Sequence, residues 1–236
     1  MEIRGRRRCK SCEREWSYYD TGEVACPACG SMQSVGVGGR ARHTDSADPL
    51  DLSAHRTAAN DDALSAVVDD LKSDLRTYLR ARGFVHGGEL RELDDTYLAA
   101  RELLHAVDVL VRVRDPDEDT ELYVLSLLRG ADAGERPEPE AVPQAMTAAR
   151  GLAYAESLAA YRRDFATWLD DNPHPEAAKT LSTLSEHVKR AEALHGDVPV
   201  EQAESLVRVA RELTRYVRDD DESALAAARD RLSRLA

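Results

Sequence analysis

The sequence predicts a small β module at residues 1–39 and an all-α helical bundle at residues 61–236. Three observations support this division. All four cysteines lie between residues 9 and 29, among strong turn and strand signals. Residues 40–60 are polar, show no periodicity and are predicted to form a linker. From about residue 61 onward, apolar residues recur at helical spacing.

The cysteines form two CxxC pairs, and thirteen residues separate Cys12 from Cys26. A module of about forty residues is usually too small to fold on apolar burial alone, so it needs a metal or disulfides. Zinc prefers four ligands in a tetrahedron, and two CxxC turns on facing hairpins supply them. The pattern therefore predicts one structural Zn²⁺ held by Cys9, Cys12, Cys26 and Cys29.

Iron and disulfides are the alternatives at these cysteines. Four thiolates also suit iron, and the run Cys26 to Gly30 matches the knuckle of rubredoxin-like sites, although Glu13 follows Cys12 where those sites favour Gly. Disulfides would require an oxidising compartment. The chain opens Met1-Glu2-Ile3-Arg4 without the apolar region of a secretory signal, so we expect a cytoplasmic location and zinc.

The residues between the pairs predict a β-hairpin. Trp16 and Tyr18 alternate with polar residues, a turn is expected at Asp20-Thr21-Gly22, and Val24 resumes the strand pattern. Residues 31–37 would add a third strand.

Basic residues gather on the first predicted strand of this module. Arg6, Arg7, Arg8 and Lys10 would form a basic edge, and together with Trp16 they are the candidate partner-binding residues. Such an edge could meet phosphates or an acidic protein surface. It could instead be an edge strand that is protected from aggregation by its charges.

The cysteine pairs and the hairpin resemble the zinc ribbons of the transcription factor IIB type, over residues 1–39 only. The whole chain is also similar to an uncharacterised haloarchaeal family that carries such a ribbon. The resemblance implies the zinc-ribbon fold and a metal bound by four thiolates. It also implies, less specifically, a role in transcription, because ribbons of this kind recur in many proteins.

About seven helices are expected in the second part, each with a start or stop signal. Asp94 or Asp95 would cap the second helix, and Asp119 or Thr120 the third. Pro143, Pro175 and Pro199 would open later helices, because proline suits the first helical turn. The expected helices span residues 61–82, 94–115, 119–129, 143–169, 175–195, 199 to the Asp219–Asp221 run, and 222–235.

The charge distribution separates the two parts. The chain has 44 acidic and 32 basic side chains, and residues 1–43 carry a net charge of +3 within a total of −12. An acidic surface with few lysines is typical of proteins from a high-salt cytoplasm, although a GC-rich genome would also favour Arg over Lys. The acidic second part is a poor nucleic-acid binder by itself.

A second metal site is the main alternative function. Glu102-Leu-Leu-His105 and Glu192-Ala-Leu-His195 match the Glu-x-x-His motif of di-iron bundles, which would make the chain a rubrerythrin-like oxidoreductase. Short motifs of this kind also arise by chance, and His195 directly precedes the helix stop Gly196.

We expect a non-enzymatic zinc-ribbon interaction protein that acts in transcription or another nucleic-acid process. Its partner would be a protein, with nucleic acid as an alternative partner of the ribbon. No apolar run approaches the length that a membrane span needs, so we expect no membrane association.

Overall fold

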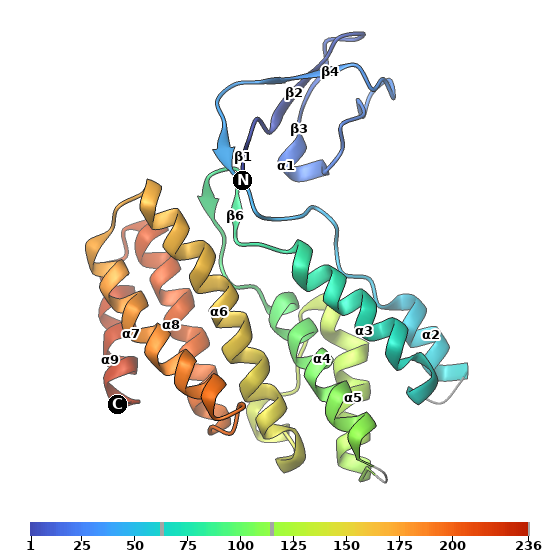
Figure 1. The fold of residues 1–236 in the computed structure, drawn as a ribbon, viewed down its shortest axis with the longest axis vertical. Helices are drawn as coiled ribbons and strands as arrows, with labels where there is room; N and C mark the ends of the chain where they lie inside the picture. Colours follow the sequence, from blue (N-terminus) through green and yellow to red (C-terminus); the bar gives the residue numbers. More distant parts are fainter. Residues whose placement is uncertain (62–63, 114–115, 236) are drawn as a thin grey trace.

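The computed structural model describes residues 1–61, 64–113 and 116–235. It is mostly helical, with a few small sheets and a cluster of four cysteines near the N-terminus. Figure 1 shows the N-terminal module projecting from one end of a helical body, with β1 and β6 close to the junction. The strands that carry the cysteines thus lie apart from the helices of the body.

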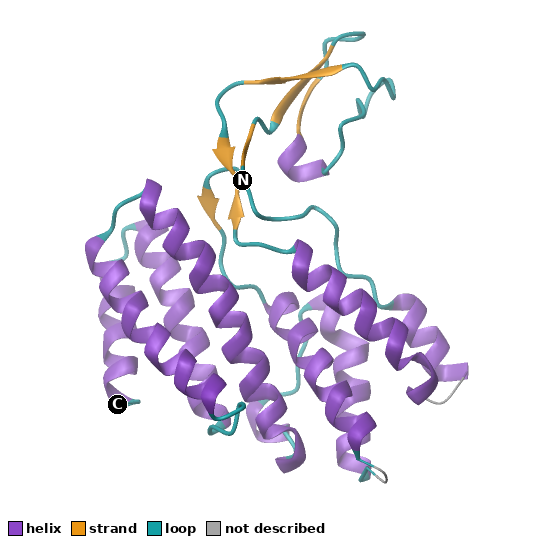
Figure 2. Cartoon of the chain, in the orientation of Figure 1, coloured by secondary structure: helices purple, strands orange, loops and turns teal. Residues whose placement is uncertain are grey.

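The N-terminal module is built on a three-stranded antiparallel sheet (Figure 2). Strand β2 (Arg6–Cys9) lies between β3 (Glu15–Ser17) and β4 (Ser34–Val37), so the strand expected to form a basic edge is the central one. The hairpin expected between the cysteine pairs is wrong, because β3 ends at Ser17, the chain continues in a short helix, α1 (Tyr18–Thr21), and Val24 lies outside any strand. The Ser17 hydroxyl caps this helix by accepting the backbone N–H of Asp20, a local signal that the alternation pattern does not contain.

Residues 40–60, predicted to be a linker, contain regular structure. Strand β5 (Ala41–Arg42) pairs with β1 (Glu2–Ile3), and helix α2 (Ser53–Asp61) begins before the expected helical boundary. The polar residues that made this segment resemble a linker instead bond to the body: the Thr44 hydroxyl donates to Asp164 at 2.6 Å, and Arg82 pairs with Asp45 at 2.8 Å. Polarity alone could not reveal these partners.

A small hairpin on the body completes the junction. Strands β6 (Val85–His86) and β7 (Glu89–Leu90) pair with each other, and the backbone N–H of Thr44 donates to the carbonyl of Val85 at 2.8 Å. The Tyr19 and His43 rings lie 4.7 Å apart, and His86 bonds Asp20 at 2.9 Å. The module is thus fixed to the body through backbone hydrogen bonds, an aromatic contact and a side-chain hydrogen bond.

Seven helices of the body correspond to the seven expected from the sequence. Asp94 caps α4 as predicted, whereas the cap of α5 is Asp117 rather than Asp119 or Thr120. The expected start of the first helix includes residues 62–63, and the expected end of the second includes residues 114–115. These residues lie outside the described part of the chain. The observed bounds are α3 (Leu64–Ala81), α4 (Asp95–Arg112), α5 (Glu118–Gly130), α6 (Thr147–Asp171), α7 (Pro175–Ala193), α8 (Val200–Asp219) and α9 (Glu222–Arg234).

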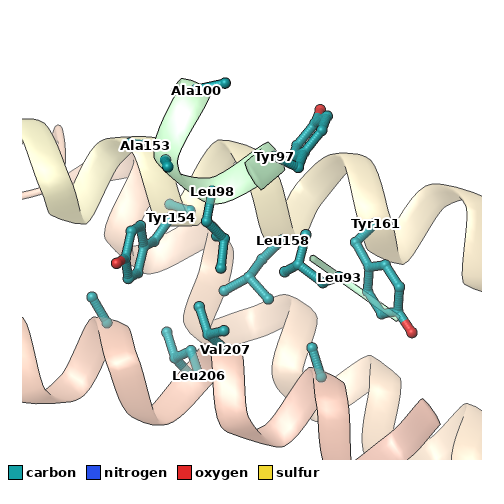
Figure 3. Close-up of a cluster of buried hydrophobic side chains, with 14 of the residues drawn as sticks. Leu93, Tyr97, Leu98, Ala100, Ala153, Tyr154, Leu158, Tyr161, Leu206 and Val207 are labelled. Carbon is teal, nitrogen blue, oxygen red and sulfur yellow. The ribbon is translucent and has the colours of Figure 1, made fainter. Parts of the chain in front are cut away.

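Helices α4 and α6 form the centre of the body. Helix α4 packs against α3, α5 and α6, and α6 packs in turn against α7 and α8 (Figure 1). Figure 3 shows side chains of α4, α6 and α8 meeting in this core, including Leu98, Leu158 and Val207. At Gly151 the approach is so close that a Cβ atom would lie 2.1 Å from the carbonyl oxygen of Gly196. The lack of a side chain at Gly151 therefore allows the loop after α7 to approach α6 closely.

Charged groups are also buried inside the body. Glu102 on α4 is fully buried and lies 3.7 Å from Arg150 on α6, which is 2% exposed. The hydroxyl of Tyr123 also donates to Glu102, and Arg150 bonds Glu204 and the carbonyl of Pro137.

None of the helices in the described part of the chain has an apolar stretch long enough to cross a bilayer.

Candidate metal centre

The four cysteine sulfurs converge at one end of the N-terminal module. All four lie within 4.8 Å of one another, and the Cys9–Cys29 and Cys12–Cys26 pairs are each separated by 3.6 Å. A tetrahedral zinc ion with Zn–S bonds of about 2.3 Å would place its sulfurs about 3.8 Å apart. The cysteines are free, so no disulfide joins them. The residues therefore fit a tetrahedral metal ion.

The protonation of the cysteines also fits a cation at their centre. Backbone N–H groups of Cys12 and Ser11, directed at the sulfur, lower the pKa of Cys9 to about 6. At Cys29 the N–H of Ser31 acts in the same direction, but hydrogen bonds to the sulfurs of Cys12 and Cys9 outweigh it and raise the pKa to about 12. Four sulfurs this close cannot all ionise unless a cation balances them, and a bound metal would do so.

Each CxxC pair is held by a tight turn. The N–H of Gly30 donates to the carbonyl of Cys26 at 2.8 Å, and Gly30 has a left-handed φ of 70°, which glycine adopts without strain. Glu13, which follows the first pair, adopts a φ of 61°. The two turns thus share a backbone conformation even though only one contains glycine.

Trp16 is part of the module's own small core rather than its surface. It is 9% exposed, packs with Cys9 and Cys26, and donates its indole N–H to the carbonyl of Glu23 at 3.0 Å. Only a small part of this candidate partner-binding side chain is therefore accessible to a partner. Trp16 pairs with Arg7 across the sheet, so its side chain lies on the same face as that of Cys9, against which it packs.

The predicted basic edge is divided between the two faces of the sheet. Arg6 and Arg8 lie on one face, and both pair with Glu15, at 2.7 and 2.5 Å. These hydrogen bonds, from Arg8 first and then Arg6, lower the pKa of Glu15. Arg7 points to the other face, because successive residues of a strand alternate. Lys10 is exposed just after β2.

The sequence did not group Arg7 with its actual neighbours. Arg7 shares a shallow groove with Arg4 and Arg40, which lie in different segments of the chain. Alternation along β2 could have separated Arg7 from Arg6 and Arg8. Nothing in the sequence could have placed Arg40 beside Arg7, since that depends on the pairing of β4 with β2 and of β5 with β1.

The second candidate metal site is not assembled. Within the residues that the structure describes, the four cysteines are the only group of three or more ligands in reach of one ion. Glu102 is engaged by Arg150 and Tyr123, and His105 by Glu156 at 3.0 Å. His195 is exposed at the end of α7, as its position before the helix stop indicated.

Comparison with known proteins places the chain in a family without assigning an activity. Neither the curated proteins nor the solved structures include a match to it. A family model matches residues 1–232, which is nearly the entire chain and includes both the cysteine cluster and the helical body. The chain therefore belongs to the family of unknown function DUF7117.

Proposed function

We propose that this chain is a non-enzymatic interaction protein whose N-terminal module is a zinc ribbon of the transcription factor IIB type. It binds a protein partner in transcription or another nucleic-acid process, in a high-salt cytoplasm. The observation that carries this proposal is the cluster of four cysteine sulfurs within 4.8 Å of one another. Four thiolates fill the coordination sphere of zinc and leave no position for a substrate.

If the metal is structural, recognition of a partner takes place on the surface of the module. The metal would hold β2, β3 and β4 together around a core of only Cys9, Trp16 and Cys26. Such a small core cannot supply the stability of a larger domain, so metal binding would provide much of the folding energy. The result is a rigid platform suited to recognition.

The body presents this platform in a fixed orientation. Asp164 on α6 accepts the Thr44 hydroxyl at 2.6 Å and the backbone N–H of Phe84 at 2.7 Å, which joins the connecting segment to the hairpin. Trp168 donates to the carbonyl of Gly88 at 2.9 Å. A preorganised module loses less conformational entropy when it binds a partner than a freely tethered one.

The alternative, a rubrerythrin-like di-iron oxidoreductase, has less support. Its bundle site would require Glu102 to face a metal, but Arg150 lies 3.7 Å from that carboxylate. A buried cation at this distance competes directly with a metal ion. No observation in the described residues favours this function over the interaction protein.

Partner capture from native lysate tests the proposal, with the full zinc-loaded chain compared with Cys26→Ser. We expect transcription or ribosomal proteins to be recovered by the wild type and lost with the variant. Circular dichroism must show that the helical body of Cys26→Ser is still folded. An identical set of partners for both proteins would contradict a recognition role for the ribbon.

A further inference from the structure

A groove of about 670 Å³ runs along the side of the N-terminal module, beside β1 and β4. Its basic residues are Arg4, Arg7 and Arg40. The apolar residues of its wall include Ile3, Tyr18 and Val24, and Val24 is 37% exposed. The groove therefore combines the guanidinium groups of three arginines with apolar side chains on its wall.

The arginines of the groove are free to bind a ligand. No ion pair among the described residues involves Arg4, Arg7 or Arg40, whereas Arg6 and Arg8 share the carboxylate of Glu15. The one bond that orients Arg7 is from its Nε to the Ser34 hydroxyl at 3.0 Å, which leaves both terminal nitrogens available. Three unneutralised guanidinium groups around one concavity would attract an anionic partner, and each can bind a carboxylate with two parallel hydrogen bonds.

The groove's lining favours an acidic peptide over a nucleic acid. Single-stranded nucleic acids are usually bound on several stacking aromatic rings, and Tyr18 is the sole aromatic side chain among the lining residues. A long polyanion would further extend over the body, which carries most of the chain's negative charge.

We propose that this groove binds a short segment of a partner protein in which carboxylates alternate with aliphatic side chains. The carboxylates pair with Arg4, Arg7 and Arg40, and the aliphatic side chains cover Ile3 and Val24. This inference rests on the proposed function, since it names the kind of partner that the ribbon recognises. It differs from the basic edge expected from sequence, because Arg6 and Arg8 take no part.

Fluorescence anisotropy with a labelled peptide of alternating Glu and Leu tests the inference. The zinc-loaded full chain is used, at a salt concentration where circular dichroism shows it folded. Arg4→Gln with Arg7→Gln should weaken binding by at least about tenfold, because two charge-assisted contacts are lost. Arg6→Gln with Arg8→Gln removes the same charge from the opposite face and should change the affinity by less than about twofold.

Four results would overturn the inference: no binding by the wild type, equal weakening by both double variants, equal binding of a Gln/Leu peptide, or tighter binding of a single-stranded oligonucleotide. Zinc content and circular dichroism of each variant show whether a loss of binding reflects unfolding. The partner-capture experiment separates this inference from the proposed function. If Cys26→Ser abolishes capture while the peptide does not bind, only the groove assignment falls.

Discussion

At the scale of single residues, the buried contact between Glu102 and Arg150 constrains the stability of the helical body. Glu102 is fully buried, and burial raises its pKa even though Arg150 and Tyr123 oppose the shift. One of its carboxylate oxygens has no hydrogen-bond partner. Its charge is therefore compensated mainly by Arg150. Removal of the Arg150 side chain would leave a buried carboxylate without a nearby cation.

Arg150→Met should consequently lower the free energy of unfolding by about 3–5 kcal/mol, as measured by denaturant titration. Arg234→Met is the matched control, because Arg234 forms an exposed pair with Asp230 and should contribute less than about 1 kcal/mol. A double variant that adds Glu102→Gln should recover part of the loss, since the stranded charge is removed. An equal, small effect of Arg150→Met and Arg234→Met would contradict this account.

At the scale of elements, the packing of α4, α6 and α8 holds the body together. Leu158 on α6 is 1% exposed and lies in this contact (Figure 3). Leu158→Ala should destabilise the body by about 2–5 kcal/mol, because it removes buried apolar contacts and leaves a cavity. Leu122→Ala, at a position 55% exposed on α5, should cost less than about 1 kcal/mol. Similar denaturation midpoints for both variants would contradict the buried position of Leu158 between these helices.

The stability that the junction between the module and the body contributes should depend on pH. Burial, and then the nearby His86, lower the pKa of His43 below its ordinary value of 6.5, against the opposing charges of Asp45 and Asp20. The N–H of Gly87 also donates to Nδ1 of His43 at 3.2 Å, which requires that nitrogen to be unprotonated. Well above pH 6.5 the histidine is neutral in both the folded and the unfolded state, so it contributes no pH dependence there.

As the pH falls below about 6.5, the unfolded chain takes up a proton at His43 more readily than the folded one, and stability decreases. Melting temperatures between about pH 7 and pH 6 measure this, with His43→Gln as the variant that cannot titrate. His43→Gln should show a shallower decline than the wild type, whereas His195→Gln, at an exposed position, should leave the decline unchanged. Identical curves for wild type and His43→Gln would exclude His43 as the cause.

For the whole molecule, net charge is the property most directly tied to the expected high-salt environment. The chain carries −12, and most of its excess carboxylates are on the helical body. Their repulsion is screened at molar salt, where the Debye length is about 3 Å, but much less at about 0.1 M, where it is about 10 Å. The melting temperature should therefore fall as KCl is reduced from about 1 M to about 0.1 M. A melting temperature independent of salt would mean that the acidity is only compositional.

The parts that could be predicted from sequence are those specified by local patterns. The CxxC spacing brought the four cysteines together, and apolar periodicity located the helices from α3 to α9. Long-range pairing could not be predicted: Thr44 bonds Asp164 across 120 residues, and this contact turns an apparent linker into a structural connection. The groove was missed for the same reason, since Arg4, Arg7 and Arg40 meet only when the strands pair.

The identity and coordination of the metal test the central claim most directly. Elemental analysis combined with X-ray absorption spectroscopy of the purified chain should show one zinc ion with four sulfur ligands at about 2.3 Å. The signal should disappear in Cys26→Ser, because a thiolate ligand is removed. A red protein with one iron per chain, or zinc with nitrogen or oxygen ligands in place of sulfur, would contradict the structural zinc centre formed by Cys9, Cys12, Cys26 and Cys29.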